Sequence, residues 1–195
     1  DSSGAITITG NTLFHDGQAQ KGGAIYLSAY VSLDIDGATF TNNDAENDGG
    51  AISVMASSLN MLATNATFQS NTAGDNGGAI ANADTTSWSL LDVDFIDNEA
   101  AKSGGAVYVY PYWPGLGDLD IRGNFTTNDA QNGGAIYAFS SNSLSIEDST
   151  FTSNTATNDG GALYIDQVSY FTAKRAETCL NSASADGGAA YIHTY

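Results

Sequence analysis

Paired aspartates are the residues of this chain whose type and spacing best suit chemistry. The pairs are Asp34/Asp36, Asp92/Asp94 and Asp118/Asp120. Two carboxylates at acid–base distance, or Ca²⁺-binding aspartates beside a basic residue, would equip a polysaccharide-cleaving enzyme. Each pair, however, flanks an apolar residue that should face a core, so both carboxylates should point to solvent. Arg122, next to Asp118/Asp120, is then expected to form a surface salt bridge, and we expect no enzyme.

A second set of polar residues directly precedes the Gly-Gly pairs of the chain. These residues are Asp48, Asn76, Asn132, Asp159 and Asp186. If they stack on one another, their carboxylates repel, and a divalent cation such as Ca²⁺ would relieve the repulsion. Neutral residues interrupt the series, and the GGxGxDxUx calcium repeat is absent. We therefore expect these residues to cap turns, with no metal and no cofactor, and keep bound Ca²⁺ as the alternative.

The histidines and the cysteine of the chain do not form a recognisable catalytic or metal-binding motif. His15 and His193 stand at opposite ends of the sequence, and no metal or nucleophile motif includes both. Cys179 is the single cysteine and falls beside a position that is Phe elsewhere. We expect it to be a buried, small apolar side chain rather than a nucleophile.

The segment VYVYPYWPGLG, residues 107–117, is the most distinctive aromatic stretch. Its Pro and Gly residues predict a loop that presents Tyr110, Tyr112 and Trp113. Exposed aromatic side chains stack on sugars or anchor protein contacts, so these three are the candidate ligand-binding residues. The alternative is that the loop covers apolar surface on its own domain.

The charge balance excludes two classes of partner. The chain has 22 acidic and 5 basic residues and a formal net charge of −17. Nucleic acids and anionic lipid surfaces both require clustered Lys and Arg. No apolar run approaches the length of roughly 18 residues that a membrane-spanning helix needs, so we expect no membrane insertion by this segment.

Three short phrases recur in phase and reveal the elements that position these residues. Gly-Gly pairs begin at Gly22, Gly49, Gly77, Gly104, Gly133, Gly160 and Gly187, which are 27 to 29 residues apart. A Phe-x-x-Asn phrase supplies Phe40, Phe68, Phe95, Phe125 and Phe151 with Asn43, Asn71, Asn98, Asn128 and Asn154, and Asn181 continues the series. Apolar residues alternate at Leu33/Ile35, Leu59/Met61, Leu119/Ile121 and Leu144/Ile146, whereas Leu90, Leu91 and Val93 leave the register of that repeat open. Each period thus holds three short strands.

Three strands per period of about 27 residues predict an all-β fold, a parallel β-helix of about seven coils. In such a solenoid equivalent residues stack, so the Phe residues form an inward ladder and the Asn residues a hydrogen-bonded ladder at a turn. We expect the ladder Asn to occupy the left-handed region. In each Gly-Gly pair, one Gly supplies positive φ and the other allows close approach of a neighbouring coil.

Paired GGA(I/L/V) and FxxN repeats resemble those of the chlamydial polymorphic outer-membrane proteins, from Phe14 to Tyr191. The resemblance implies a right-handed parallel β-helix passenger of an autotransporter that is exposed at a cell surface and acts in adhesion. The general preference for right-handed crossovers agrees. The repeats here are more regular than in that family.

We therefore expect residues 1–195 to form a single β-helix domain. The chain begins within one coil and ends inside a Gly-Gly strand, which predicts a segment of a longer solenoid or a unit that stacks end to end. The expected function is that of a non-enzymatic extracellular adhesin or structural stalk that contacts a host or neighbouring-cell protein or glycan. A polysaccharide-binding or polysaccharide-cleaving β-helix is the alternative. Ice binding, indicated by Thr39-Phe-Thr41 and Thr150-Phe-Thr152, is third because other repeats interrupt the threonine rows.

Overall fold

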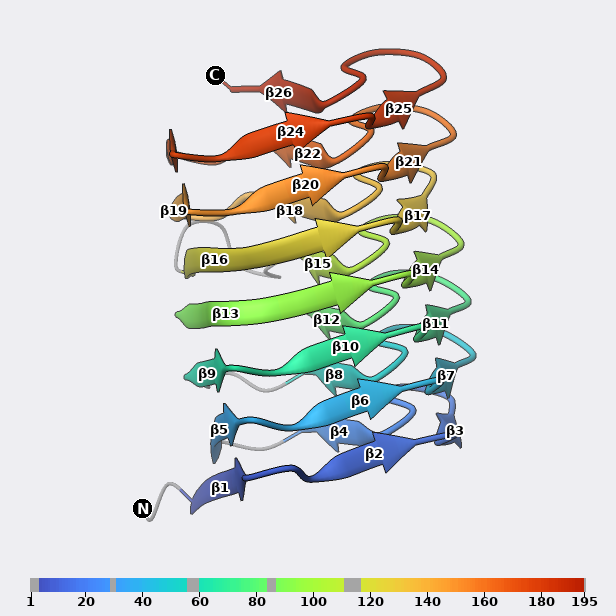
Figure 1. The fold of residues 1–195 in the computed structure, drawn as a ribbon, viewed down its shortest axis with the longest axis vertical. Coiled ribbons are helices and arrows are strands. Elements are labelled where there is room, and N and C mark those ends of the chain that lie inside the picture. The colour runs from blue at the N-terminus through green and yellow to red at the C-terminus, as the bar shows by residue number, and fades with distance from the viewer. Residues whose placement is uncertain (1–3, 29–30, 56–59, 84–86, 111–116, 195) are drawn as a thin grey trace.

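The computed structural model describes residues 4–28, 31–55, 60–83, 87–110 and 117–194, and every regular element in them is a β-strand. The strands form three parallel sheets, one with twelve strands and two with seven (Figure 1). Among the described residues, no helix is long and apolar enough to cross a membrane. The predicted all-β solenoid is confirmed.

Sheet A contains the longest strands. They are β1 (Gly4–Thr9), β2 (Leu13–His15), β5 (Val31–Asp36), β6 (Thr39–Thr41), β9 (Met61–Thr64), β10 (Thr67–Gln69), β13 (Trp88–Ile96), β16 (Asp118–Thr126), β19 (Ser143–Glu147), β20 (Thr150–Thr152), β23 (Tyr170–Lys174) and β24 (Glu177–Cys179).

Sheets B and C each contribute one strand to every coil. Sheet B consists of β3 (Gln18–Ala19), β7 (Asp44–Ala45), β11 (Thr72–Ala73), β14 (Glu99–Ala100), β17 (Asp129–Ala130), β21 (Thr155–Ala156) and β25 (Ser182–Ala183). Sheet C consists of β4 (Ile25–Leu27), β8 (Ile52–Val54), β12 (Ile80–Asn82), β15 (Val107–Val109), β18 (Ile136–Phe139), β22 (Leu163–Asp166) and β26 (Ala190–His193).

Seven coils follow from this order, and we number them from the N-terminus. Coil 1 runs from β1 to β4 and coil 7 from β23 to β26. In Figure 1 the chain crosses the near face from left to right, returns along the far face and climbs with each coil. That sense of rotation makes the helix right-handed, as expected.

Phenylalanines stack along the core of sheet A. Phe14, Phe40, Phe68, Phe95, Phe125 and Phe151 are in register from coil to coil. Neighbouring rings lie 4.8–5.0 Å apart between centroids and nearly parallel. The last five are completely buried, and each contributes roughly 1.5–3 kcal/mol of hydrophobic free energy. This ladder joins the coils into one core.

The strand before the Phe ladder differs from the expected register in coil 3. Met61 and Ala63 are the buried pair in coil 3 and align with Leu33 and Ile35. The expected partner of Met61, Leu59, lies outside the described residues. The spacing to the Phe position explains the difference, because Leu33 and Met61 both precede their Phe by seven residues.

Coil 4 contains a β-bulge that resolves the open register there. Leu90 and Val93 are both completely buried, although three positions separate them. The pairing of β13 with β16 shifts between Leu91 and Val93, and the extra residue, Asp92, has a φ of 57°. A bulge places one additional residue in one strand and bends it locally. Both apolar residues can therefore face the core.

The Gly-Gly pairs take the two roles predicted for them. The first Gly of every pair has a positive φ, for example 65° at Gly77. The second lies against the next coil, and a Cβ on Gly78 would sit 2.1 Å from the carbonyl oxygen of Gly105. Only glycine fits there, because any side chain would collide with backbone.

At the Asn corner the prediction of a left-handed Asn is wrong. The positive φ falls on the preceding residue, which is Asn42, Ser70, Asp97, Thr127, Ser153 or Leu180. This preceding residue turns the chain, and the ladder Asn that follows points into the corner. The two tasks of the corner are thus divided between two neighbouring residues.

Candidate functional site

An asparagine ladder lines the inside of the corner between sheets A and B. Its members are Asn43, Asn71, Asn98, Asn128, Asn154 and Asn181, and the first five are at most 1% exposed. Asn71 Nδ2 donates to Asn98 Oδ1 at 2.9 Å and to the Phe40 carbonyl at 3.1 Å, and Asn98 Oδ1 also accepts from the Asn71 backbone N–H. The same pattern repeats from coil to coil. These side chains are therefore fully engaged in structure.

An aromatic ladder covers the outer face of sheet C in coils 4 to 7. Its first row is Tyr108, Tyr137, Tyr164 and Tyr191, whose neighbouring ring centroids lie 4.7–5.3 Å apart. Tyr110 stacks on Phe139 at 4.7 Å in a second row. Burial, with lesser contributions from Tyr164 and Asp166, raises the pKa of Tyr137 to about 12. The hydroxyl of Tyr137 stays neutral well above physiological pH, and the first row is a flat aromatic strip. The second row is aromatic in coils 4 and 5 and continues with the paired Asp166 and His193 in coils 6 and 7.

The predicted ligand-binding residues fall partly on this face. Tyr110 directly follows β15 and is 37% exposed, with its ring parallel to that of Tyr108. Tyr112 and Trp113 lie outside the described residues. The structure thus places one of the three candidates, and it places that one at the end of a stack that sequence patterns did not single out.

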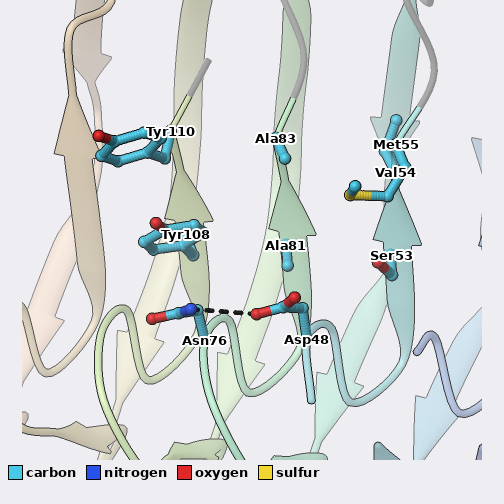
Figure 2. A pocket seen from close by; sticks show the side chains of 9 residues that line it. All are labelled: Asp48, Ser53, Val54, Met55, Asn76, Ala81, Ala83, Tyr108 and Tyr110. Atoms are coloured by element: carbon cyan, nitrogen blue, oxygen red, sulfur yellow. Dashed lines mark hydrogen bonds between the residues drawn. The ribbon is translucent and has the colours of Figure 1, made fainter. Parts of the chain in front are cut away.

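A cavity of about 180 Å³ opens on sheet C next to Tyr108 and Tyr110. Figure 2 shows the two tyrosines on the chain of β15, beside Ala81 on β12 and Ser53 on β8. Ser53 and Ala81 occupy the row that holds Tyr108 in coil 4, because the strands pair in register. Their small side chains form the floor of a notch in the face. We call this cavity the sheet C notch.

Polar groups converge on the notch. Asn76 Nδ2 donates to Asp48 Oδ1 at 3.0 Å, as drawn in Figure 2, and Lys21 Nζ lies 3.4 Å from the other Asp48 oxygen. Ser53 is only 1% exposed, and its Oγ has no hydrogen-bond partner in the described part of the chain. A buried hydroxyl left unpaired costs about 1–3 kcal/mol. An unpaired buried polar group in a native structure is rare and calls for an explanation, such as a bound ligand or water.

Sequence reasoning missed this notch, although a signal was present. The residue after the Gly-Gly-Ala-apolar phrase is Tyr in five coils but Ser53 in coil 2 and Ala81 in coil 3. Those two exceptions are the floor of the notch. A comparison of the repeats position by position would have located it.

The paired carboxylates point outward, as expected. Asp34, Asp36, Asp92, Asp118 and Asp120 are exposed, and Asp94 is half-buried. The predicted partner of Arg122 is wrong, however. Arg122 pairs with Asp92 of the preceding coil at 2.7 and 2.9 Å, because the bulge carries Asp92 out of the strand and toward the guanidinium. Asp92 and Asp94 are thus engaged separately, Asp94 with Asn124.

Every basic residue links two adjacent coils. Lys21 pairs with Asp48, Lys102 with Asp75, Arg122 with Asp92, Lys174 with Glu147, and Arg175 with both Glu147 and Asp148. The hydrogen bond from Lys174 is the main reason that the pKa of Glu147 lies below its usual range, and the hydrogen bond from Arg175 has this effect on Asp148. These groups form solvent-exposed ion pairs.

The remaining candidates do not form a reactive cluster. Among the described residues, no group of three or more His, Cys, Asp or Glu side chains could hold a metal ion. His15 pairs with Asp16 and His193 with Asp166 in the first and last coils. Cys179 is exposed, so its predicted burial is wrong. It aligns with Thr152 rather than with Phe151, and that position points outward.

The threonine rows on sheet A are broken in the structure. Thr39 aligns with Thr67, but the next two positions are Asp94 and Asn124. In the second row Gln69 and Ile96 separate Thr41 from Thr126. A flat and regular hydroxyl array is therefore interrupted in the middle of the solenoid.

Comparison with known proteins identifies the repeat. The family model of the Chlamydia polymorphic membrane protein repeat matches residues 37–54, 65–83, 92–110 and 148–166. Each match begins in sheet A or shortly before it and ends at or shortly after a sheet C strand, so it spans the Asn corner and the Gly-Gly corner. No curated protein and no solved structure matches the chain. The chain is a β-solenoid, four segments of which are similar to the Chlamydia polymorphic membrane protein repeat.

Proposed function

We propose that the protein is a non-enzymatic, cell-surface stalk that acts as an adhesin through one flank. The observation that carries this proposal is the continuous pair of ladders in the core. Phe rings and Asn amides join the coils without a break from coil 2 to coil 6. Repetitive contacts between nearest neighbours produce a stiff, extended body with long side faces. Such a body is suited to display a surface away from a membrane.

The repeat supports an extracellular location. Its family description names a membrane protein of Chlamydia, and a surface protein must expose most of its length to partners. The aromatic ladder of sheet C is the best contact face, because Tyr and Trp are enriched where binding energy concentrates. Tyr110, Tyr112 and Trp113 are the proposed anchors, and a protein or glycan of a host or neighbouring cell is the proposed partner.

The other functions have less support. One or both carboxylates of each predicted pair bond to an adjacent coil. In the described part of the chain these bonds engage Asp36, Asp92, Asp94 and Asp118 in structure, which gives a polysaccharide-cleaving site less support. Ice binding lacks a continuous threonine array. Polysaccharide binding is favoured by one observation, the sheet C notch beside Tyr110.

A bead-adhesion assay tests the adhesin proposal. Fluorescent beads coated with the chain are expected to attach to at least one member of a panel of cultured animal cells and bacteria. The double variant Tyr110→Ser/Trp113→Ala should reduce attachment, because loss of aromatic anchors costs about 2 kcal/mol or more, which is a factor of about 30 in affinity.

Tyr26→Ser is the matched control, since Tyr26 lies on the same sheet in coil 1 and is also exposed. It should leave attachment unchanged. Failure of the beads to attach to any cell in the panel contradicts the adhesin proposal, and equal loss in both variants contradicts the assignment of the anchors.

A further inference from the structure

The sheet C notch is a gap of two rungs in an otherwise aromatic row. The row runs in register from Tyr26 through Ser53 and Ala81 to Tyr108, and then to Tyr137, Tyr164 and Tyr191. Ser53 and Ala81 are almost completely buried although they occupy outward positions. The gap is therefore recessed below the face and bounded by the start of the tyrosine stack.

The wall of the notch is suited to a flat ring. Tyr108 lies on β15 and Tyr110 directly after it, their rings are parallel within 4°, and both line the cavity. The same two rings stack on Tyr137 and Phe139 of the next coil at 5.3 and 4.7 Å. A ring that enters above Ala81 would continue the stack of Tyr108 by one rung, beside the ring of Tyr110. The apolar face of a sugar ring is a natural occupant of such an aromatic wall.

The floor and lower end of the notch offer mainly hydrogen-bond acceptors. An ionised carboxylate accepts at about four positions, and Asp48 uses two of them for Asn76 and Lys21. Asn76 Oδ1 is a further acceptor, and Ser53 Oγ can both accept and donate. A ligand with several hydroxyl groups satisfies such a set.

The charge of the protein and the size of the notch restrict the class of ligand further. The net charge of −17 disfavours acidic ligands. Cationic ligands are disfavoured for two reasons. Lys21 already pairs with the Asp48 carboxylate, and the tyrosines line only one wall of the notch instead of forming the aromatic cage that binds quaternary ammonium groups. The volume of about 180 Å³ is smaller than the roughly 300–1,000 Å³ of sites that enclose larger organic ligands. This space suits one ring of a longer chain.

We propose that the sheet C notch binds one pyranose ring of an uncharged glycan. The ring stacks on Tyr108 above Ala81, beside Tyr110, and its hydroxyl groups bond to Asp48, Asn76 and Ser53. This inference rests on the proposed adhesin function, since it names the ligand class of the same flank. It differs from that proposal in locating the contact on described side chains of coils 2 to 4.

Isothermal titration calorimetry of the full chain tests the site, with cellohexaose, maltohexaose and mannohexaose as neutral probes. Hexagalacturonate and a trimethyl-lysine peptide are the charged comparators. At least one neutral probe should bind, and neither comparator should. Ala81→Tyr restores the residue found in most coils and fills the notch, so it should abolish binding without lowering the melting temperature.

Ser53→Ala separates a binding role from a structural one. It removes a hydroxyl that is unpaired in the free protein, so the variant should melt no lower than the parent chain. Loss of one hydrogen bond to the ligand should nevertheless weaken binding about fivefold. Tyr191→Ala is the control, because Tyr191 belongs to the same row but lies three coils beyond the notch, and it should bind as the parent does.

Three results would overturn the inference: no neutral probe binds, binding persists in Ala81→Tyr, or a charged comparator binds more tightly than every neutral probe. The bead assay keeps these failures distinct from failure of the adhesin proposal. Beads that attach to cells while no hexasaccharide binds refute the glycan site alone. Hexasaccharide binding with the expected variant pattern and no attachment to any cell refutes adhesion alone.

Discussion

Two kinds of carboxylate on the outer surface make opposite contributions to stability. Burial, reinforced by the charge of Glu99 in the preceding coil, raises the pKa of Asp129 on sheet B. A hydrogen bond from Arg175 lowers the pKa of Asp148. Asp129 therefore destabilises the fold once it is ionised, because its pKa is higher in the folded than in the unfolded chain. Asp148 stabilises the fold once it is ionised, for the opposite reason.

Asp129→Asn should stabilise the protein at pH 7 and have no effect at pH 3. Like charges directly opposite in a sheet destabilise by about 0.2–1 kcal/mol, so we expect a rise in melting temperature of about 1–3 °C for a chain of this size. The gain should disappear as the pH falls through the raised pKa of Asp129, where the carboxyl becomes neutral. Circular-dichroism melting across pH 3–7 measures it.

Asp148→Asn is the control of opposite sign. Loss of the Asp148 carboxylate should lower the melting temperature or leave it unchanged at pH 7. Any difference in melting temperature from the parent chain should vanish at acid pH. A stabilised Asp148→Asn variant, or an Asp129→Asn gain that is the same at both pH values, would contradict the electrostatic explanation.

Single residues show where sequence reasoning succeeds and fails. The positive φ of the first Gly in each pair followed from residue type alone, because few other residues tolerate that conformation. At the Asn corner the same argument selected the wrong residue, since Thr127 and Leu180 also adopt positive φ there and neither is a residue type that favours it. The burial of Cys179 depended on strand register. Thr178 occupies the Phe position, so Cys179 falls in the outward row of Thr152.

At the scale of elements, the asparagine ladder connects strands that are distant in sequence. The side-chain Nδ2 of each Asn donates to the carbonyl of a Phe residue in the preceding coil and to Oδ1 of the following Asn, as in Asn98. Buried polar networks of this kind are stabilising only when every member is satisfied. The ladder therefore enforces the register between sheets A and B.

Asn98→Ala should lower the free energy of unfolding by about 2–4 kcal/mol. The substitution leaves the carbonyl of Phe68 and the side-chain and backbone amides of Asn71 without their partner, and each buried unpaired group costs about 1–3 kcal/mol. Urea denaturation followed by circular dichroism gives the value.

Asn181→Ala is the matched substitution in coil 7, where the ladder residue is half-buried. It should destabilise clearly less than Asn98→Ala. Equal effects at both positions would mean that the ladder contributes through local turn geometry rather than through burial of a continuous network.

The elements themselves were predicted well where a repeated residue marks them. Phe and Gly-Gly fixed two strands in each coil, whereas the two-residue strands of sheet B were not predicted. The first strand was less certain in coils 3 and 4, because Met61, Ala63 and Trp88 do not repeat a residue type and the bulge at Asp92 shifts the alternation. A bulge depends on how neighbouring strands pack, so the local sequence pattern does not predict it.

At the scale of the whole molecule, a coil is an interchangeable unit. Each coil pairs with the coils before and after it, and the Asn and Gly-Gly positions recur in phase along the stack. Removal of one complete period therefore joins two surfaces that already match.

Deletion of Thr155–Asn181, which is 27 residues, should yield a folded solenoid with one coil fewer. Asn154 would then precede Ser182, which aligns with Thr155 in the parent. We expect a β-rich circular-dichroism spectrum, cooperative melting at a lower temperature, and a body shorter by about 4.8 Å in small-angle scattering. Deletion of residues 155–167 removes half a period and should prevent folding. A folded half-period variant would contradict the requirement for register.

The solenoid as a whole was accessible from the sequence because its period is nearly constant. The notch was not, since it arises from the rings missing at Ser53 and Ala81 and from the recess that their neighbours leave. Its shape depends on side chains of three coils, and on the way in which Tyr108 and Tyr110 pack.

The parallel, in-register stacking also determines how the rod responds to mechanical force. Hydrogen bonds between coils run along the axis, so every coil boundary carries the tension applied to the two ends, and the boundaries break one at a time rather than all together. An end coil can detach while the rest of the rod keeps its contacts. Each detached coil of 27 to 29 residues releases on the order of 90 Å of extended chain at about 3.4 Å per residue. A rod built in this way lengthens in steps under load and dissipates mechanical work before all of its coils are lost.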